Sequence, residues 1–171
     1  MAGADYQITD RTILGLAIGY ENTELDTDYN GFGGVSGDLE GDGYTIAPYI
    51  STALTDMAEA SLVIGYSDLE YDTVRFDPNT GNRISGSTDA DRYFVDASVA
   101  GIHKFDDHWR LRGKAGVFYA NEDKDAFTET EAVTAAQIAN GSNESDFGQI
   151  TVEGRLGYMF QNFEPYAPVS Y

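Results

Sequence analysis

The sequence predicts an all-β protein, an up-and-down antiparallel transmembrane β-barrel of about eight strands. Three observations support this fold class. Large apolar residues alternate with small or polar ones along several segments, and short and long connections alternate along the chain. The 171 residues also include 19 Gly and 12 Tyr but only 4 Pro. Alternation with a period of two indicates a strand whose faces lie in different environments. Short turns at one end and long loops at the other are typical of outer-membrane barrels.

Four strands are expected in the N-terminal half. Residues 3–9 form a short first strand. In residues 12–21 the even positions are large and uncharged, whereas the odd positions are mostly small. Residues 44–54 show a weaker pattern because Pro48 lies among them, and a proline within a ladder requires a bulge or a distortion. Residues 58–67 repeat the alternation, again with the large residues at even positions.

Four more strands are expected in the C-terminal half. Residues 92–102 alternate apolar residues with Arg, Asp and Ser. The pattern is sharper in residues 109–122 and 149–160, where one face is apolar and the other carries charged side chains. Residues 164–171 form a short last strand. The whole chain, 1–171, is therefore predicted to be one β-barrel domain.

The connections expected to be long loops span about residues 22–43, 68–91 and 121–146, and they hold 19 of the 29 acidic residues. The formal charge of −19 therefore belongs mainly to solvated loops, and it argues against a nucleic-acid binder. The chain has no cysteine, which excludes disulfides and thiolate sites. Within the third loop, residues 132–139 (AVTAAQIA) predict a short helical turn.

Aromatic residues are expected to form two belts, one at each end of the strands. The long-loop belt consists of tyrosines, and Trp109 and Phe160 lie at the short-turn end. Such belts are typical of the two interfaces of a bilayer. The alternative interpretation is that tyrosine merely favours strands. The tyrosines of the long-loop belt are Tyr20, Tyr44, Tyr66, Tyr93 and Tyr119.

A charged network is predicted inside the barrel. Arg110, Arg112 and Lys114 share the polar face of one strand, and the flanking strands contribute Asp96 on one side and Glu153 with Arg155 on the other. Ions in a confined lumen need counter-charges. We interpret these residues as a network of ion pairs that fills the interior of the barrel. The functional alternative is a charged constriction or an electrostatic hold on a traversing segment.

No enzymatic site, cofactor or strong metal site is predicted. The pair Asp106 and Asp107 lies in a tight turn, which does not suit a glycosidase. Asp26, Asp28 and Asn30 match the first half of a calcium-binding loop, but its twelfth position is Gly37 instead of glutamate. These three residues are therefore a weak calcium candidate, and a solvated loop is the favoured interpretation.

The chain resembles the C-terminal β-domain, or translocator, of bacterial autotransporters. The resemblance rests on GADYQ, LGLAIGYENTELD, GYTIAPYI, SLVIGYSDLEYDTVR and GQITVEGRLGYMFQNFEPYAPVSY. It implies an outer-membrane barrel that contacts lipid and that anchors or exports an N-terminal passenger. The family's barrel has twelve strands, so eight strands here imply truncation at both ends, or a small relative that closes by itself.

The sequence is also compatible with two alternative functions. The first is a free-standing eight-stranded outer-membrane barrel whose acidic loops serve adhesion or structure. The second is a soluble lipocalin-like barrel that binds an apolar ligand. In that case Leu14, Leu16 and Ile18 would line the inner cup, and the Arg110, Arg112 and Lys114 row would face water.

Overall fold

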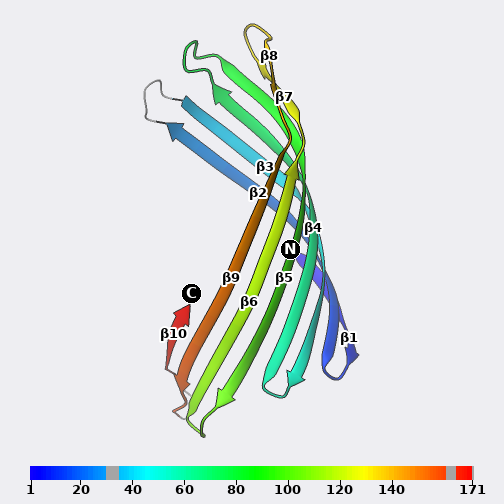
Figure 1. The fold of residues 1–171 in the computed structure, drawn as a ribbon, viewed down its shortest axis with the longest axis vertical. Helices are drawn as coiled ribbons and strands as arrows, with labels where there is room; N and C mark the ends of the chain where they lie inside the picture. Colours follow the sequence, from blue (N-terminus) through cyan, green and yellow to red (C-terminus); the bar gives the residue numbers. More distant parts are fainter. Residues whose placement is uncertain (30–34, 161–164, 171) are drawn as a thin grey trace.

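The computed structural model describes residues 1–29, 35–160 and 165–170. These residues form one antiparallel sheet of ten strands, in which the main path runs β1-β2-β3-β4-β5-β6-β9-β10 (Figure 1). In this part of the chain, no helix has both the length and the apolar character needed to cross a membrane. The strands are β1 (Ala2–Thr9), β2 (Thr12–Tyr29), β3 (Val35–Thr55), β4 (Ala58–Phe76), β5 (Arg83–Lys104), β6 (Trp109–Lys124), β7 (Phe127–Glu131), β8 (Gln137–Asn140), β9 (Asn143–Tyr158) and β10 (Tyr166–Ser170).

The predicted all-β class is confirmed, and each of the eight predicted segments overlaps one strand of the main path. The difference lies in closure. β1 and β10 are the two edges of a curved sheet, and they do not pair with each other among the described residues. An eight-stranded barrel that closes by itself would need that pairing.

The ladder between β3 and β4 is interrupted where proline was expected to disturb it. Ile46 pairs with Tyr66 and Tyr49 pairs with Val63, but Ala47 and Pro48 have no register partner on β4. The register is the same on both sides of the gap, so the proline causes a local break rather than a bulge. Proline has no N–H group to donate to the ladder, which explains the break.

The segments expected as long loops are largely paired strand, so this prediction is wrong. β2 and β3 stay in register as far as Tyr29 and Val35, and β4 and β5 as far as Phe76 and Arg83. β6 and β9 also stay paired as far as Lys124 and Asn143, and the hairpin of β7 and β8 lies between them in sequence. A ladder is held by backbone hydrogen bonds, which a polar side chain does not prevent, so acidic composition was a poor guide to loops. Figure 1 shows these extensions at the end of the sheet opposite the tight turns.

The predicted helical turn at 132–139 is found only at the start of the segment, where the N–H of Ala135 donates to the carbonyl oxygen of Glu131 at 3.0 Å, the i to i−4 hydrogen bond of one helical turn. Residues 137–139 belong to strand β8 instead. β7 and β8 form a hairpin here, and β7 pairs with β5 through Ile84–Glu131 and Ser85–Thr130. The amide N–H of Glu131 donates to the carbonyl oxygen of Ala136 at 2.9 Å, which closes the loop. Ala135 has a positive φ of 57°, a conformation that ends a right-handed helix.

Glycine allows close contact between neighbouring strands. A Cβ atom at Gly43 on β3 would lie 2.2 Å from the backbone oxygen of Asp68 and 2.9 Å from Cα of Leu69 on β4. A backbone cannot move aside as a side chain can. On the neighbouring strands, Cβ atoms at Gly15 and Gly65 would fall within the rings of Tyr49 and Phe94. Because Gly15 and Gly65 have no side chain, the rings of Tyr49 and Phe94 can lie over them on the polar face.

We expect Gly43→Ala to lower the free energy of unfolding by about 1–3 kcal/mol, because the new methyl group would push β4 away from β3. Unfolding by guanidinium in detergent, followed by circular dichroism, measures this change. Gly148→Ala is the matched control, because a Cβ there meets nothing within 4 Å. Equal stabilities of the two variants would contradict the packing described.

Candidate functional site

Side-chain contacts between distant strands identify the concave face of the sheet. Nη1 of Arg92 on β5 lies 2.9 Å from Oε1 of Glu21 on β2, although β3 and β4 lie between these strands. In a flat sheet, three strand spacings would separate the two backbones by about 14 Å. Tyr71 on β4 likewise reaches Glu122 on β6, with the hydroxyl 3.2 Å from Oε1. The sheet therefore curls toward the face that carries these polar side chains.

The lipocalin-like alternative required the opposite curvature. Leu14, Leu16 and Ile18 lie on the other face of β2, and all three are exposed. The Arg110, Arg112 and Lys114 row lies on the same face as the contacts of Arg92, because even positions on β6 pair with even positions on β5. The concave face is thus the charged one, and the convex face is the apolar one.

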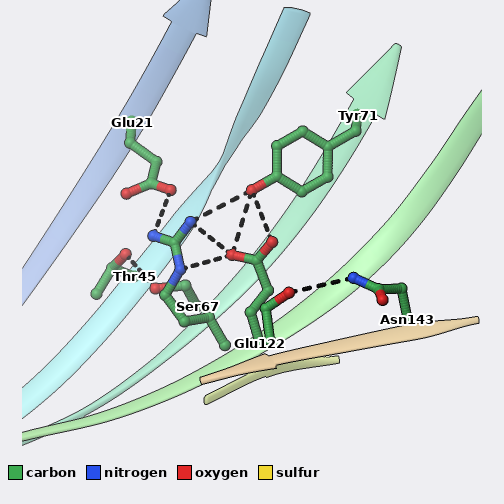
Figure 2. Close-up of polar contacts among 8 residues, drawn as sticks. Glu21, Thr45, Ser67, Tyr71, Glu122 and Asn143 are labelled. Carbon is green, nitrogen blue, oxygen red and sulfur yellow. Dashed lines mark hydrogen bonds and ion pairs between the residues drawn. The ribbon is translucent and has the colours of Figure 1, made fainter. Parts of the chain in front are cut away.

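Arg92 is the centre of a loop-end cluster that also contains Glu21, Tyr71 and Glu122. Figure 2 labels these three partners. Its Nη2 atom lies 2.8 Å from Oε2 of Glu122, and its Nε donates to the same oxygen at 2.9 Å. The Tyr71 hydroxyl donates to Glu122 and accepts from Nη2 of Arg92 at 3.3 Å. Two carboxylates and one phenol therefore share one guanidinium, and the cluster ties four strands together.

Sequence reasoning missed the loop-end cluster. Glu21, Arg92 and Glu122 all occupy polar-face positions of predicted strands, which was the available signal. Their meeting depends on the register between strands, and a single strand's alternation does not give that register.

The predicted charged row occupies the other end of the concave face. Lys114 is in register with Glu153, and Arg112 is in register with Arg155. Together with β10, the turn between β3 and β4, and β5, these four residues line a groove of about 710 Å³, here called the turn-end groove. The guanidinium of Arg155 lies 3.5 Å above the ring of Tyr166 on β10.

Two residues of the predicted network lie outside this groove. Asp96 is in register with Phe118, and it lines a separate hollow of about 230 Å³ together with Lys114. Arg110 is in register with Gly157, one position nearer the turns. The structure therefore brings Arg112, Lys114, Glu153 and Arg155 together but sets Asp96 and Arg110 on either side of them.

The predicted long-loop belt lies on the convex face. The rings of Tyr20 and Tyr44 are 5.2 Å apart, and those of Tyr66 and Tyr93 are 5.1 Å apart. Tyr119 on β6 is also exposed and donates its hydroxyl to Asp146 at 2.5 Å. These tyrosines thus form a row across β2 to β6.

The aromatic residues predicted at the short-turn end lie at the opposite end of the strands from the tyrosine row. Trp109 packs edge-on against Tyr158 at 5.0 Å, and Phe160 is exposed. Trp109 and Tyr119 are separated along β6 by ten residue steps. This corresponds to about 33 Å of strand, or about 25 Å across a bilayer at the usual tilt, which matches the apolar band of outer-membrane barrels.

The weak calcium candidate does not form a described loop. Asp26 and Asp28 lie in β2, in register with Asp38 and Ser36 of β3, and Asn30 lies outside the described residues. Extended backbone does not wrap around an ion as a calcium-binding loop does. Within the described ranges, no group of three or more acidic or histidine side chains is placed to hold a metal ion.

Asp106, part of the acidic pair in the β5–β6 turn, uses its carboxylate to bind the backbone of that turn. Its Oδ1 atom accepts hydrogen bonds from the backbone N–H of His108 at 2.7 Å and of Trp109 at 2.6 Å. These bonds lower the pKa of the Asp106 carboxyl. The side chain therefore closes the turn.

An ion pair between a partly exposed arginine and a buried glutamate holds the β7–β8 hairpin to the extension of β4. Nη2 of Arg75 lies 2.7 Å from Oε2 of Glu129, and its Nε donates to Oε1 at 3.1 Å. Glu129 is only 4% exposed. Glu131, also buried, accepts hydrogen bonds from Asn82 and Thr134. The hairpin is therefore anchored through both of its glutamates.

Comparisons with known proteins agree with this architecture. A family model described as the autotransporter beta-domain matches residues 1–171. The translocator domain of autotransporter NalP from Neisseria meningitidis is similar in structure, with a TM-score of 0.69 and 12% sequence identity. The match covers 98% of this chain and 56% of that chain, so this chain spans about half the length of the NalP domain.

Two further solved structures are similar. The ferric yersiniabactin uptake receptor FyuA from Yersinia pestis has a TM-score of 0.53 and 12% identity, over 94% of this chain and 25% of that chain. The RagAB peptide transporter has a TM-score of 0.51 and 8% identity, over 97% and 26%. At these identities the likenesses show the fold alone. No curated protein matches the sequence.

The ion pair of Arg75 and Glu129 predicts that the stability of the β7–β8 hairpin depends on pH. Hydrogen bonds from the Arg75 guanidinium hold the pKa of the Glu129 carboxyl below its ordinary value of 4.5. A lowered folded-state pKa gives stability that is present above the unfolded value and is lost as the pH falls through the folded value. We therefore expect the amides of β7 and β8 to lose hydrogen-exchange protection as the pH falls below 4.5, the ordinary pKa of the carboxyl.

Glu129→Gln provides the control for this experiment. The variant keeps the shape of the side chain but has no titrating group. Its hairpin should be less protected at neutral pH, and its protection should vary little between neutral and acid pH once intrinsic exchange rates are corrected. The same acid loss in both proteins would show that Glu129 is not its cause.

Proposed function

Because the chain belongs to the autotransporter β-domain family, we propose that it forms part of a barrel wall that anchors and exports a passenger of the same parent protein. The family belongs to the bacterial outer membrane. One observation carries the proposal for this chain: the sheet curls toward its charged face and leaves its aliphatic face outside. A translocator needs this arrangement, with a wet interior and an exterior that lipid can cover.

The convex face fits a lipid environment. Ile18 and Ile64 are each 55% exposed, and Ile150 is 73% exposed. Apolar area left in water costs about 25 cal/mol per Å², whereas acyl chains cover it without that cost. In this proposal the row of five tyrosines lies at the loop-end interface and Trp109 with Phe160 at the turn-end interface. Short turns of outer-membrane barrels face the periplasm, so the acidic extensions project from the cell.

The concave face suits a water-filled passage. The loop-end cluster and the turn-end groove hold most of its charged side chains, one near each end of the membrane-spanning strands. Charged walls keep a lumen hydrated, so that a polar polypeptide can cross it. We assign to Asp96, Arg110, Arg112, Lys114, Glu153 and Arg155 the role of lining this passage, and they have no catalytic role in the proposal.

Substitutions at two adjacent residues of β9 test which face of the sheet contacts lipid, and they test the proposed function as well. Val152 lies on the convex face near the middle of the strand, and Thr151 lies on the concave face. An arginine on the lipid face near the bilayer midplane costs about 2–4 kcal/mol. We expect Val152→Arg in the whole parent protein to reduce membrane insertion and passenger exposure about tenfold or more, because 1.4 kcal/mol corresponds to a factor of ten.

Thr151→Arg is the matched control, because it adds the same side chain to the charged lumen. It should retain the wild-type amounts within about twofold. The measurement is the amount of protein in the outer-membrane fraction and of passenger cleaved by a protease added outside the cells. Equal loss in both variants, or normal insertion of the chain with no passenger outside, would refute the proposed function.

A further inference from the structure

The β7–β8 hairpin leaves the wall of the sheet and lies over its concave face. Gly86 of β5 points to the concave face, because it is an even number of residues from Arg92 on the same strand. A Cβ atom at Gly86 would lie 3.2 Å from Cα of Glu129 and 3.1 Å from the backbone oxygen of Thr128. The main chain of β7 therefore passes directly above the concave side of β5.

Burial on the concave face coincides with the position of the hairpin. On β5, the side chains of Ile84, Thr88 and Ala90 face this side, and each is at most 6% exposed. The even-numbered residues of the same strand from Arg92 to Lys104 are all half-buried or exposed. The concave face is thus covered where the hairpin lies and open nearer the turns.

The hairpin is attached mainly through polar contacts. Its two buried residues are Glu129, which pairs with Arg75, and Glu131, which accepts side-chain hydrogen bonds. Two of its apolar residues, Val133 and Ile138, are 73% and 37% exposed. Water can replace polar contacts at a small net cost in free energy for each bond. The hairpin can therefore be released without unfolding the strands beneath it.

A hinge is built into the point where the hairpin joins the sheet. Lys124 and Asn143 form the last register pair of β6 and β9, and Phe127 and Asn140 form the first pair of the hairpin. Two residues separate these pairs on each strand, and a Cβ atom at one of them, Gly141, would meet nothing within 4 Å. Both strands are interrupted at the same level, so the hairpin can rotate about this line as a unit.

We propose that the β7–β8 hairpin is a lid at the loop-end mouth of the lumen, hinged where β6 and β9 end. The inference rests on the proposed function, because the concave face borders a lumen only when this sheet is part of a barrel wall. In Figure 1 the hairpin lies at the end of the sheet opposite the tight turns. The extensions of β2–β3 and β4–β5 continue the wall, whereas the hairpin turns inward. A polypeptide that leaves the lumen has to displace it.

A disulfide between β5 and β7 tests the lid, because the natural chain contains no cysteine. Ser85→Cys/Thr130→Cys joins two register partners, whose Cα atoms are close enough for a disulfide. In planar bilayers we expect the whole parent protein to switch between a low and a high ion conductance. The oxidised variant should stay in the low state, and a reducing agent should restore the switching. Asp72→Cys/Ser87→Cys is the matched control, because it joins β4 to β5 on the convex side and should switch as the wild type does.

A second variant tests the lid without a new cross-link. Arg75→Ala removes the partner of the buried Glu129, so it should raise the time spent in the high-conductance state about tenfold. Arg83→Ala is its control, because it removes the same charge from the convex side of the β5 extension.

The lid is overturned if the oxidised Ser85 and Thr130 variant conducts as the wild type does, or if Arg75→Ala changes the conductance no more than its control. Either result leaves the proposed function standing. Failure of the Val152 and Thr151 comparison, while the disulfide still holds the conductance low, would refute the proposed function and leave the lid.

Discussion

The direction in which the sheet curls determines everything else in this molecule. A sheet with one charged and one aliphatic face can be covered by lipid only on the aliphatic side, because lipid offers no hydrogen bonds to ions. Arg92 fixes this direction, since its contact with Glu21 spans β3 and β4. The guanidinium can reach that carboxylate only if the charged face is concave. The apolar convex face and the polar groove follow from the same curvature.

The extensions above the tyrosine row show how a membrane sheet continues into water. Their ladders persist without an apolar exterior, and Leu69, Ile84 and Ala90 are buried there. The ion pair of Arg75 and Glu129 ties the β7–β8 hairpin to β4. Secondary structure outside the membrane is thus supported by contacts within the protein.

Much of the fold could be predicted from residue alternation, because a strand between two unlike environments must place its residues with a period of two. The same rule assigned Arg112 and Lys114 to one face and Ile150 and Val152 to the other. It failed for the extensions, where the acidic composition suggested loops although the backbone remains paired. It also failed for residues 137–139, because they pair with β7 as the second strand of a hairpin.

Contacts between strands could not be predicted in this way. Arg92 and Glu21 are 71 residues apart in the sequence, and only register and curvature bring them together. For the same reason Asp96 was expected beside the arginines, although it is paired with Phe118.

Spin labels at single cysteines along β9 test the curvature most directly, because the natural chain contains no cysteine. In lipid vesicles, oxygen concentrates in the bilayer, and a water-soluble nickel chelate stays in aqueous space. Oxygen should relax labels at 150, 152 and 156 most strongly, and the nickel chelate those at 149, 151 and 153. The reverse phase, or no alternation, would contradict the account.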